Sequence, residues 1–128
     1  MKNKNSSIPE NLLQASSALA DNLLHSEPMM LFKLAEKQFD NDPLASNLFR
    51  KLSQAQAEMR KRQTRNAVSE EDLEELRNLQ YQVRANQTIQ EYDNAQLAAM
   101  SYIQEINQEI SALIGFDFCS FARRSGCC

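Results

Sequence analysis

The sequence contains very few residues that reverse the direction of a polypeptide chain. Only two glycines and three prolines occur among its 128 residues. Chains so poor in turn-forming residues fold into a small number of long elements. The alternation of apolar and polar residues that indicates a half-buried strand does not occur anywhere along the chain. The sequence therefore predicts an all-α protein.

Residues typical of helix starts divide the apolar pattern into separate helices. Ser7 and Ser26 are each followed two residues later by a proline and are expected to cap two short N-terminal helices. Asp42 is expected to cap a longer helix over residues 43–66, because the following Pro43 suits a first helical turn. The part of the chain after these three helices carries the last and much the longest apolar stripe.

The longest apolar stripe begins at Ser69 and Asp72, which together approximate a capping box, and ends at Gly115, a typical C-cap residue. Its phase shifts at Asn86–Gln87, where we expect a kink or a short break. An unbroken helix over residues 70–114 would be about 68 Å long. That length far exceeds the diameter of a compact small domain.

These helix lengths predict a long antiparallel hairpin, in which helix 43–66 folds back on the C-terminal helix. Two long helices cannot bury an apolar face of this length between themselves, so we expect an oligomer or a partner protein. A monomeric bundle with a broken last helix is the alternative. We divide the chain into a disordered N-terminus (1–7), a single helical domain (8–115) and a cysteine-bearing tail (116–128).

The charge and hydropathy of the chain indicate where the protein is located and which classes of partner are not expected. A net charge of −3 gives no general reason to expect nucleic acid or an anionic membrane as a partner. No apolar run approaches the ~20 residues that span a bilayer. The N-terminal lysines are not followed by the apolar segment of a secretory signal. We therefore expect a cytoplasmic protein without membrane contact.

Patterns of known catalytic sites do not occur in the sequence. His25 is the only histidine, two glycines cannot build a phosphate-binding loop, and no helix carries the Glu-x-x-His pattern of di-iron bundles. The many carboxylates of the segment SEEDLEE suit the first turn of a helix, where the helix dipole favours negative charge. We therefore expect no enzymatic activity and no small-molecule substrate.

A basic segment precedes this acidic one. Phosphate groups of RNA are one possible ligand, and solvated charges at a helix C-terminus, where cations are favourable, are the simpler reading. The candidate nucleic-acid-binding residues are Arg60, Lys61, Arg62 and Arg65.

All cysteines lie in the tail, as Cys119, Cys127 and Cys128. Their C-x7-C-C spacing matches neither zinc ribbons nor ferredoxins. Cytoplasmic thiols stay reduced, so metal or redox chemistry is favoured over disulfides. Three thiolates are one short of a four-cysteine site, so a metal or cluster site would need a second copy, another protein or an exogenous ligand to complete it. Structurally idle, redox-sensitive thiols are the alternative.

Two segments of the chain resemble the YlbF/YmcA family of small helical bacterial proteins. The segment NQTIQEYDNAQLAAMSYIQEINQEISALIG carries the family's pattern of an asparagine, an aromatic residue, an alanine and an isoleucine-rich end. The segment EPMMLFKLAEKQFDNDPLASNLFRKLSQAQAEM resembles the family's earlier helices. The likeness spans roughly residues 12 to 115. The family positions are Asn86, Ile89, Tyr92, Ala95, Ile106 and Ile110.

The resemblance implies a non-enzymatic regulator that forms homo-oligomers or binds related helical family members. The best-understood branch works in a complex that carries iron–sulfur clusters and acts on the RNA-processing machinery, affecting biofilm formation, competence and sporulation. The cysteine-bearing tail is similar to that of the YlbF branch, although the branch has a longer, glycine-rich tail with more cysteines. If the likeness extends to the tail, Cys119, Cys127 and Cys128 are the expected cluster ligands. A self-associating structural protein with incidental thiols is the alternative.

Overall fold

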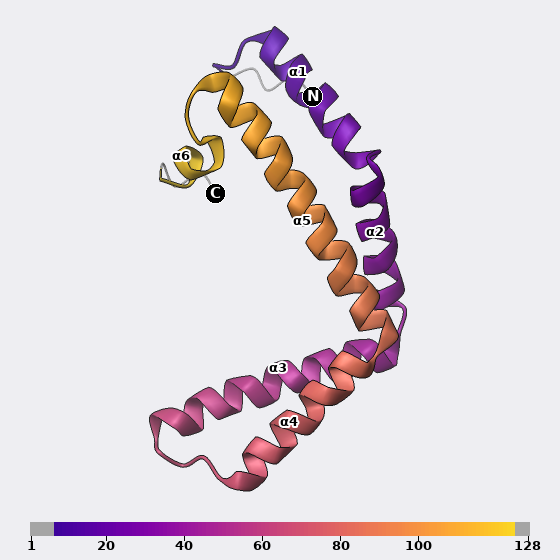
Figure 1. Cartoon of the computed structure of the whole chain (residues 1–128), viewed down its shortest axis with the longest axis vertical. Helices are drawn as coiled ribbons and strands as arrows, with labels where there is room; N and C mark the ends of the chain where they lie inside the picture. Colours follow the sequence, from indigo (N-terminus) through magenta and orange to yellow (C-terminus); the bar gives the residue numbers. More distant parts are fainter. Residues whose placement is uncertain (1–6, 125–128) are drawn as a thin grey trace.

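The computed structural model describes residues 7–124, and these form six α-helices and no strand. The all-α prediction is therefore confirmed for the described part of the chain. Figure 1 shows a C-shaped molecule with two arms, which meet where α2 passes into α3 and α4 into α5. We call α1, α2, α5 and α6 arm one, and α3 and α4 arm two. The helices are α1 (Glu10–Leu24), α2 (Glu27–Asp40), α3 (Pro43–Thr64), α4 (Glu70–Ala85), α5 (Gln87–Ile114) and α6 (Phe118–Arg124).

Three of the predicted helix starts and ends have the expected geometry. The Asp42 carboxylate accepts hydrogen bonds from the first turn of α3, and Ser69 and Asp72 form a complete capping box on α4. Gly115 ends α5 in the left-handed conformation, at φ 85°. Each contact satisfies a backbone group that a helix end leaves without an intrahelical partner.

The two N-terminal helices begin differently from the prediction. The N-cap position of α1 is Pro9, with no side-chain cap, so the expectation that Ser7 caps this helix is wrong. Ser26 does occupy the N-cap position of α2, but its hydroxyl donates to the Leu23 carbonyl at 2.6 Å instead of accepting from the new helix. The predicted disorder of residues 1–7 falls almost wholly on residues 1–6, which lie outside the described range.

The long apolar stripe is divided at the predicted break. Asn86 adopts an extended conformation (φ −78°, ψ 119°), and its side-chain oxygen accepts from the Ile89 N–H at 3.0 Å. Asn86 therefore ends α4 and caps α5 at once. Before the break α4 packs on α3 as the predicted antiparallel hairpin, whereas beyond it α5 packs on α2.

A small apolar cluster lies at the junction of the arms. Ala45 and Leu48 of α3 pack against Ile89 of α5, and Phe39 and Val83 cover the cluster from α2 and α4. The Phe39 ring of α2 also contacts two other aromatic rings. Its centroid lies 5.1 Å from that of Tyr92 on α5 and 5.8 Å from that of Phe49 on α3. Four helices thus share one small core.

A polar contact closes the same junction. Asp42 Oδ2 accepts a hydrogen bond from the Thr88 hydroxyl at 2.7 Å, while Asp42 Oδ1 accepts from the Leu44 and Ala45 N–H groups. These bonds, with that from Thr88 having the largest effect, lower the pKa of the Asp42 carboxyl below its ordinary value. The N-termini of α3 and α5 are therefore joined through one carboxylate.

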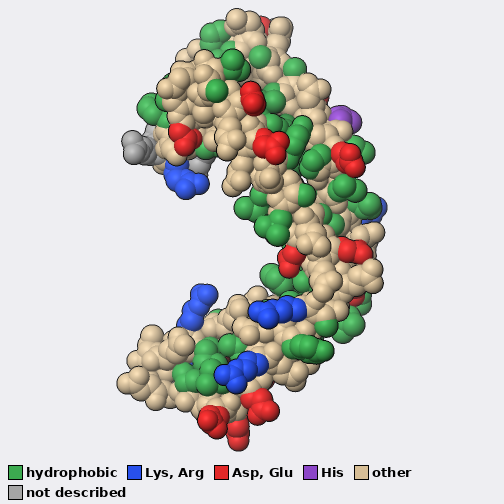
Figure 2. All heavy atoms as spheres, viewed as in Figure 1, with side chains coloured by type: hydrophobic (Ala, Val, Ile, Leu, Met, Phe, Trp, Pro, Cys, Tyr) green, Lys and Arg blue, Asp and Glu red, His purple; other side chains and the backbone are tan. Residues whose placement is uncertain are grey.

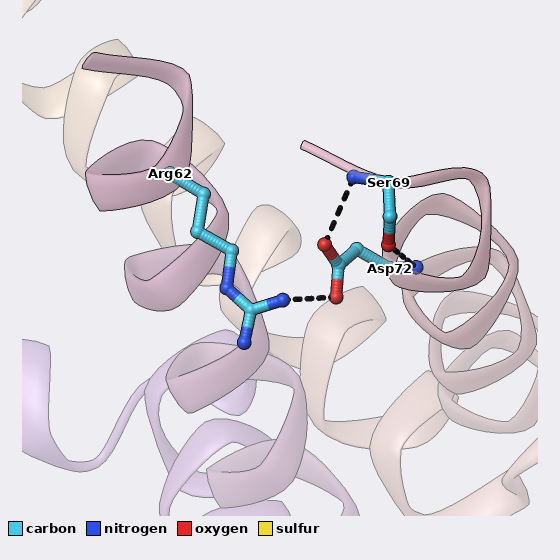
Figure 3. Close-up of polar contacts among 3 residues, drawn as sticks. All are labelled: Arg62, Ser69 and Asp72. Atoms are coloured by element: carbon cyan, nitrogen blue, oxygen red, sulfur yellow. Dashed lines mark hydrogen bonds and ion pairs between the residues drawn. The ribbon is translucent and has the colours of Figure 1, made fainter. Parts of the chain in front are cut away.

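The far end of arm two is joined by a second carboxylate, shown in Figure 3. Asp72 Oδ2 accepts from the Ser69 N–H at 3.0 Å, and the Asp72 N–H donates to the Ser69 hydroxyl at 3.2 Å. Arg62 of α3 pairs with the other oxygen of the same carboxylate. The hydrogen bond from the Ser69 N–H, followed by that from Arg62, lowers the pKa of Asp72 to about 2.

Arm one leaves many apolar side chains exposed. No residue of α1 is buried, and only Ala35 of α2 and Ile89 and Ala99 of α5 are. None of the described helices is long and apolar enough to cross a membrane. The exposed large apolar residues of arm one include Leu12, Leu19, Met30, Leu31, Leu34, Leu97, Met100 and Ile103.

Truncation of Ile89 should test whether the junction is the stability centre of the fold. Ile89 is 2% exposed, so Ile89→Ala leaves a cavity and should lower the free energy of unfolding by about 3 kcal/mol. Leu97→Ala is the matched control on the same helix, because Leu97 is 64% exposed, and it should cost less than about 1 kcal/mol. Denaturant unfolding measures both, and equal losses would contradict a core at the junction.

Replacement of Asp72 should change how stability depends on pH. A carboxyl whose pKa is lower in the folded state stabilises that state while it is ionised, so the contribution is complete above its ordinary pKa of 3.8 and is lost as the pH falls towards about 2. Asp72→Asn should therefore lower the melting temperature at pH 5 and have little effect at pH 2. Thermal unfolding across this range measures the difference, with Glu71→Gln as the control in the same turn. A difference that persists undiminished at pH 2 would contradict the assignment.

Candidate functional site

The tail folds back on the last turns of α5, as Figure 1 shows. Gly115 turns the chain, and α6 then contacts α5. The Phe118 N–H donates to the Ser111 hydroxyl oxygen at 3.1 Å, and the Cys119 N–H donates to the Asn107 side-chain oxygen at 3.3 Å. Two polar side chains one turn apart on α5 thus hold the start of α6.

Asp117 organises the first turn of α6. Its carboxylate accepts from the Ser120 N–H at 3.2 Å and from the Ser120 hydroxyl at 2.9 Å. These bonds, that from the Ser120 N–H first, lower the pKa of Asp117 below its ordinary value. The rings of Phe116 and Phe121 lie 5.2 Å apart, and both side chains remain substantially exposed. The tail therefore presents an aromatic surface beside its first cysteine.

Only one of the three predicted ligands lies in the described part of the chain. Cys119, on α6, has a free and exposed thiol. Cys127 and Cys128 lie outside the described residues, so the structure does not test whether the three thiols meet. No cluster of three or more potential metal-ligating side chains occurs within the described range. The Cys119 thiol is therefore accessible from solvent on a docked helix.

The predicted nucleic-acid-binding residues lie together at the far end of arm two. In Figure 2, Lys and Arg side chains gather mainly on this arm, next to acidic side chains at its outer edge. Arg62 pairs with Asp72 of α4, and Lys61 Nζ lies 3.5 Å from Glu58 Oε1. Arg60 and Arg65 are exposed and complete the cluster. Its positive charge is thus partly neutralised by carboxylates of the same hairpin.

Sequence reasoning did not identify the residues that position the tail. Asn107 and Ser111 are partly buried polar side chains on α5, spaced four residues apart and so on one face of the helix. Two short polar residues next to an isoleucine stripe were the available signal. Their function depends on the docking of α6, which is a contact made only in the tertiary structure.

The left-handed conformation of Gly115 should control the docking of α6. A Cβ added here would meet no atom within 4 Å, so Gly115→Ala strains only the backbone, at a cost of about 1 kcal/mol. We expect faster amide hydrogen exchange over residues 118–124, with exchange in α2 unchanged. Gly115→Asn is the matched control, because asparagine tolerates this conformation better. Unchanged exchange in the alanine variant would contradict the role of this turn.

Comparisons with known proteins identify the family. The model of a family described as control of competence regulator ComK, YlbF/YmcA, matches residues 12–114. Comparison with curated proteins gave no match, and comparison with solved structures gave none either. The match covers α1 almost from its start and ends at the last residue of α5. Neither α6 nor any of the three cysteines is part of the match. The chain therefore belongs to the YlbF/YmcA family, as its two characteristic segments predicted.

Proposed function

We propose that this protein is a non-enzymatic regulatory adaptor that acts in the cytoplasm by binding other proteins. Membership in a family that controls a competence regulator supports a regulatory role. The observation that carries the proposal is the exposure of large apolar side chains along arm one, including Leu31, Leu34 and Leu97. Extended apolar surfaces on a water-soluble chain are typical of protein interfaces.

The partners that fit these surfaces are helical. An exposed apolar row on a helix is buried most readily by another helix, so further copies of this chain or related family members are the expected partners. The resemblance to the best-understood branch extends the proposal to the RNA-processing machinery, with effects on competence, biofilm formation and sporulation. Direct RNA contact is a weaker candidate, because the basic cluster of arm two shares its surface with Asp72 and Glu58.

We also propose that the tail thiols help to hold an iron–sulfur cluster at the interface of an assembly. Thiolates are the ligands that such clusters prefer. Cys119 has a free, exposed thiol on α6, and Cys127 and Cys128 follow within nine residues of it. Because one chain supplies three thiolates, a fourth ligand must come from another copy, a partner or a small molecule.

Anaerobic reconstitution tests the cluster. The wild-type chain and a Cys119→Ser, Cys127→Ser, Cys128→Ser variant would be purified without oxygen, alone and with candidate family partners. We expect visible absorbance with bound iron and sulfide in the wild type only. Ser120→Ala, on the same short helix, is the control that keeps all three thiols. Colourless, iron-free wild-type protein with the partners present would refute the cluster.

Removal of residues 116–128 separates the adaptor from its alternative. If the tail takes part in the assembly, its removal weakens partner binding in a pull-down with the same family partners. If the protein is only a self-associating structural element with incidental thiols, oligomeric state and partner binding stay unchanged.

A further inference from the structure

The described chain passes between the two arms at two places. Between α2 and α3 the crossing consists of Asn41 and Asp42, and between α4 and α5 it is the single residue Asn86. Both crossings lie at the junction of the arms in Figure 1, and the hydrogen bond from Thr88 to Asp42 joins them. The backbone conformation of these three crossing residues therefore determines how one arm is oriented relative to the other.

The two crossings differ in how firmly the sequence fixes them. Pro43 follows Asp42, and a proline keeps the residue before it out of the helical conformation, so α2 and α3 remain separate helices. No proline follows Pro43 in the sequence, and asparagine is tolerated inside a helix. The ψ angle of 119° at Asn86 is therefore set by the contacts around it and not by the covalent chain.

Side chains replace the helical hydrogen bonds that the break at Asn86 removes. In a continuous helix the Ile89 N–H would donate to the Ala85 carbonyl, and the Arg84 carbonyl would accept from the N–H four residues further on. Instead, the Asn86 side-chain oxygen accepts from the Ile89 N–H at 3.0 Å, and the Gln90 side-chain amide donates to the Arg84 carbonyl. The bent chain thus satisfies these groups without the helical bonds.

Backbone hydrogen bonds continue on both sides of the break. The Asn86 N–H donates to the Val83 carbonyl at 3.2 Å, and the Gln90 N–H donates to the Asn86 carbonyl at 3.1 Å. Rotation of one angle, ψ of Asn86, from 119° to the helical value of about −42° would join α4 and α5 into one helix. Because both forms pair the same groups by bonds of similar strength, the local free-energy difference between them is small.

Two tertiary contacts favour the bent form. The Thr88 hydroxyl donates to Asp42 Oδ2 at 2.7 Å, and Ile89 packs on Ala45 and Leu48 of α3. Both contacts are made by the first turn of α5 with the start of arm two, so both depend on the direction in which α5 leaves Asn86. A small local preference combined with a few tertiary contacts is the arrangement of an element with two states.

We propose that Asn86 is a hinge between the arms and that the hydrogen bond between Thr88 and Asp42 is its latch. In the latched form α5 turns away from α4 at Asn86. In the open form α4 and α5 make one straight helix over residues 70–114, and α2 moves with α5, on which it packs. The hinge requires no thiol and no partner. A partner that contacts both arms would select one of the two forms.

A distance between spin labels on the two arms tests the hinge. The labels are attached to Glu74→Cys on α4 and Gln104→Cys on α5, both exposed positions, in the full-length chain with its three cysteines replaced by serine. Dilution with unlabelled chain restricts the measured distances to pairs within one molecule. A straight helix separates the two positions by about 45 Å, and the bend brings them closer. We expect the shorter distance to dominate before the latch is altered.

Thr88→Val removes the latch and keeps the shape of the side chain. The ratio of the 45 Å population to the shorter one should rise about fivefold, because the open form loses no hydrogen bond from this change. Thr88→Ser keeps the hydroxyl and should restore the original ratio. Thr64→Val is the matched control, because the Thr64 hydroxyl bonds to the Lys61 carbonyl of its own helix, and it should leave the ratio unchanged.

Asn86→Ala tests the hinge residue itself. Alanine cannot cap α5 and favours a helix interior, so the 45 Å population should rise about tenfold. Circular dichroism should show the helical content retained or increased. The same shorter distance in both Asn86→Ala and Thr88→Val would overturn the hinge. A broad distribution with no maximum near 45 Å, together with lost helical content, would also overturn it, because it would show fraying instead of a second defined form.

Discussion

The two arms of the molecule meet at one junction, where the carboxylate of Asp42 joins the starts of two helices. One of its oxygens accepts the free N–H groups at the start of α3, and the other accepts the Thr88 hydroxyl in the first turn of α5. The adjoining core is small, with Ala45, Leu48 and Ile89 at its centre, and this hydrogen bond links α3 to α5 beside it. The fully buried Ile89 and the ionised Asp42 secure the same point by apolar packing and by polar pairing.

Two arms that diverge from one junction cannot cover each other's apolar faces. Arm two closes on itself as the α3–α4 hairpin and is joined at its far end by Arg62 and Asp72. In arm one, α5 is covered by α2 along one side, and the leucines of α1 stay largely exposed. The fold thus leaves apolar surface available to other chains, and this surface supports an adaptor role more directly than any single residue does.

The tail adds chemistry to this scaffold without contributing to its core. Gly115 reverses the chain, and Asn107 and Ser111 hold the start of α6, so Cys119 of α6 has a defined place beside the end of α5 although its thiol is exposed. In the cluster proposed above, this thiol would be one of the ligands that this chain supplies. The family match ends at residue 114 and therefore does not include the tail.

The sequence by itself determined the helical class, the family, the break at Asn86 and the caps at Asp42, Ser69 and Gly115. These features depend on local bonds between residues a few positions apart, or on periodicity, and both can be read along the chain. Ser7 was misread because a serine that precedes a helix need not make the capping bond. Only the tertiary structure decided that α5 leaves the hairpin to pack on α2, and that the tail docks on the end of α5. Those features require contacts such as that between Asp42 and Thr88, 46 residues apart. An apolar stripe has the same sequence whether its own chain or another chain buries it.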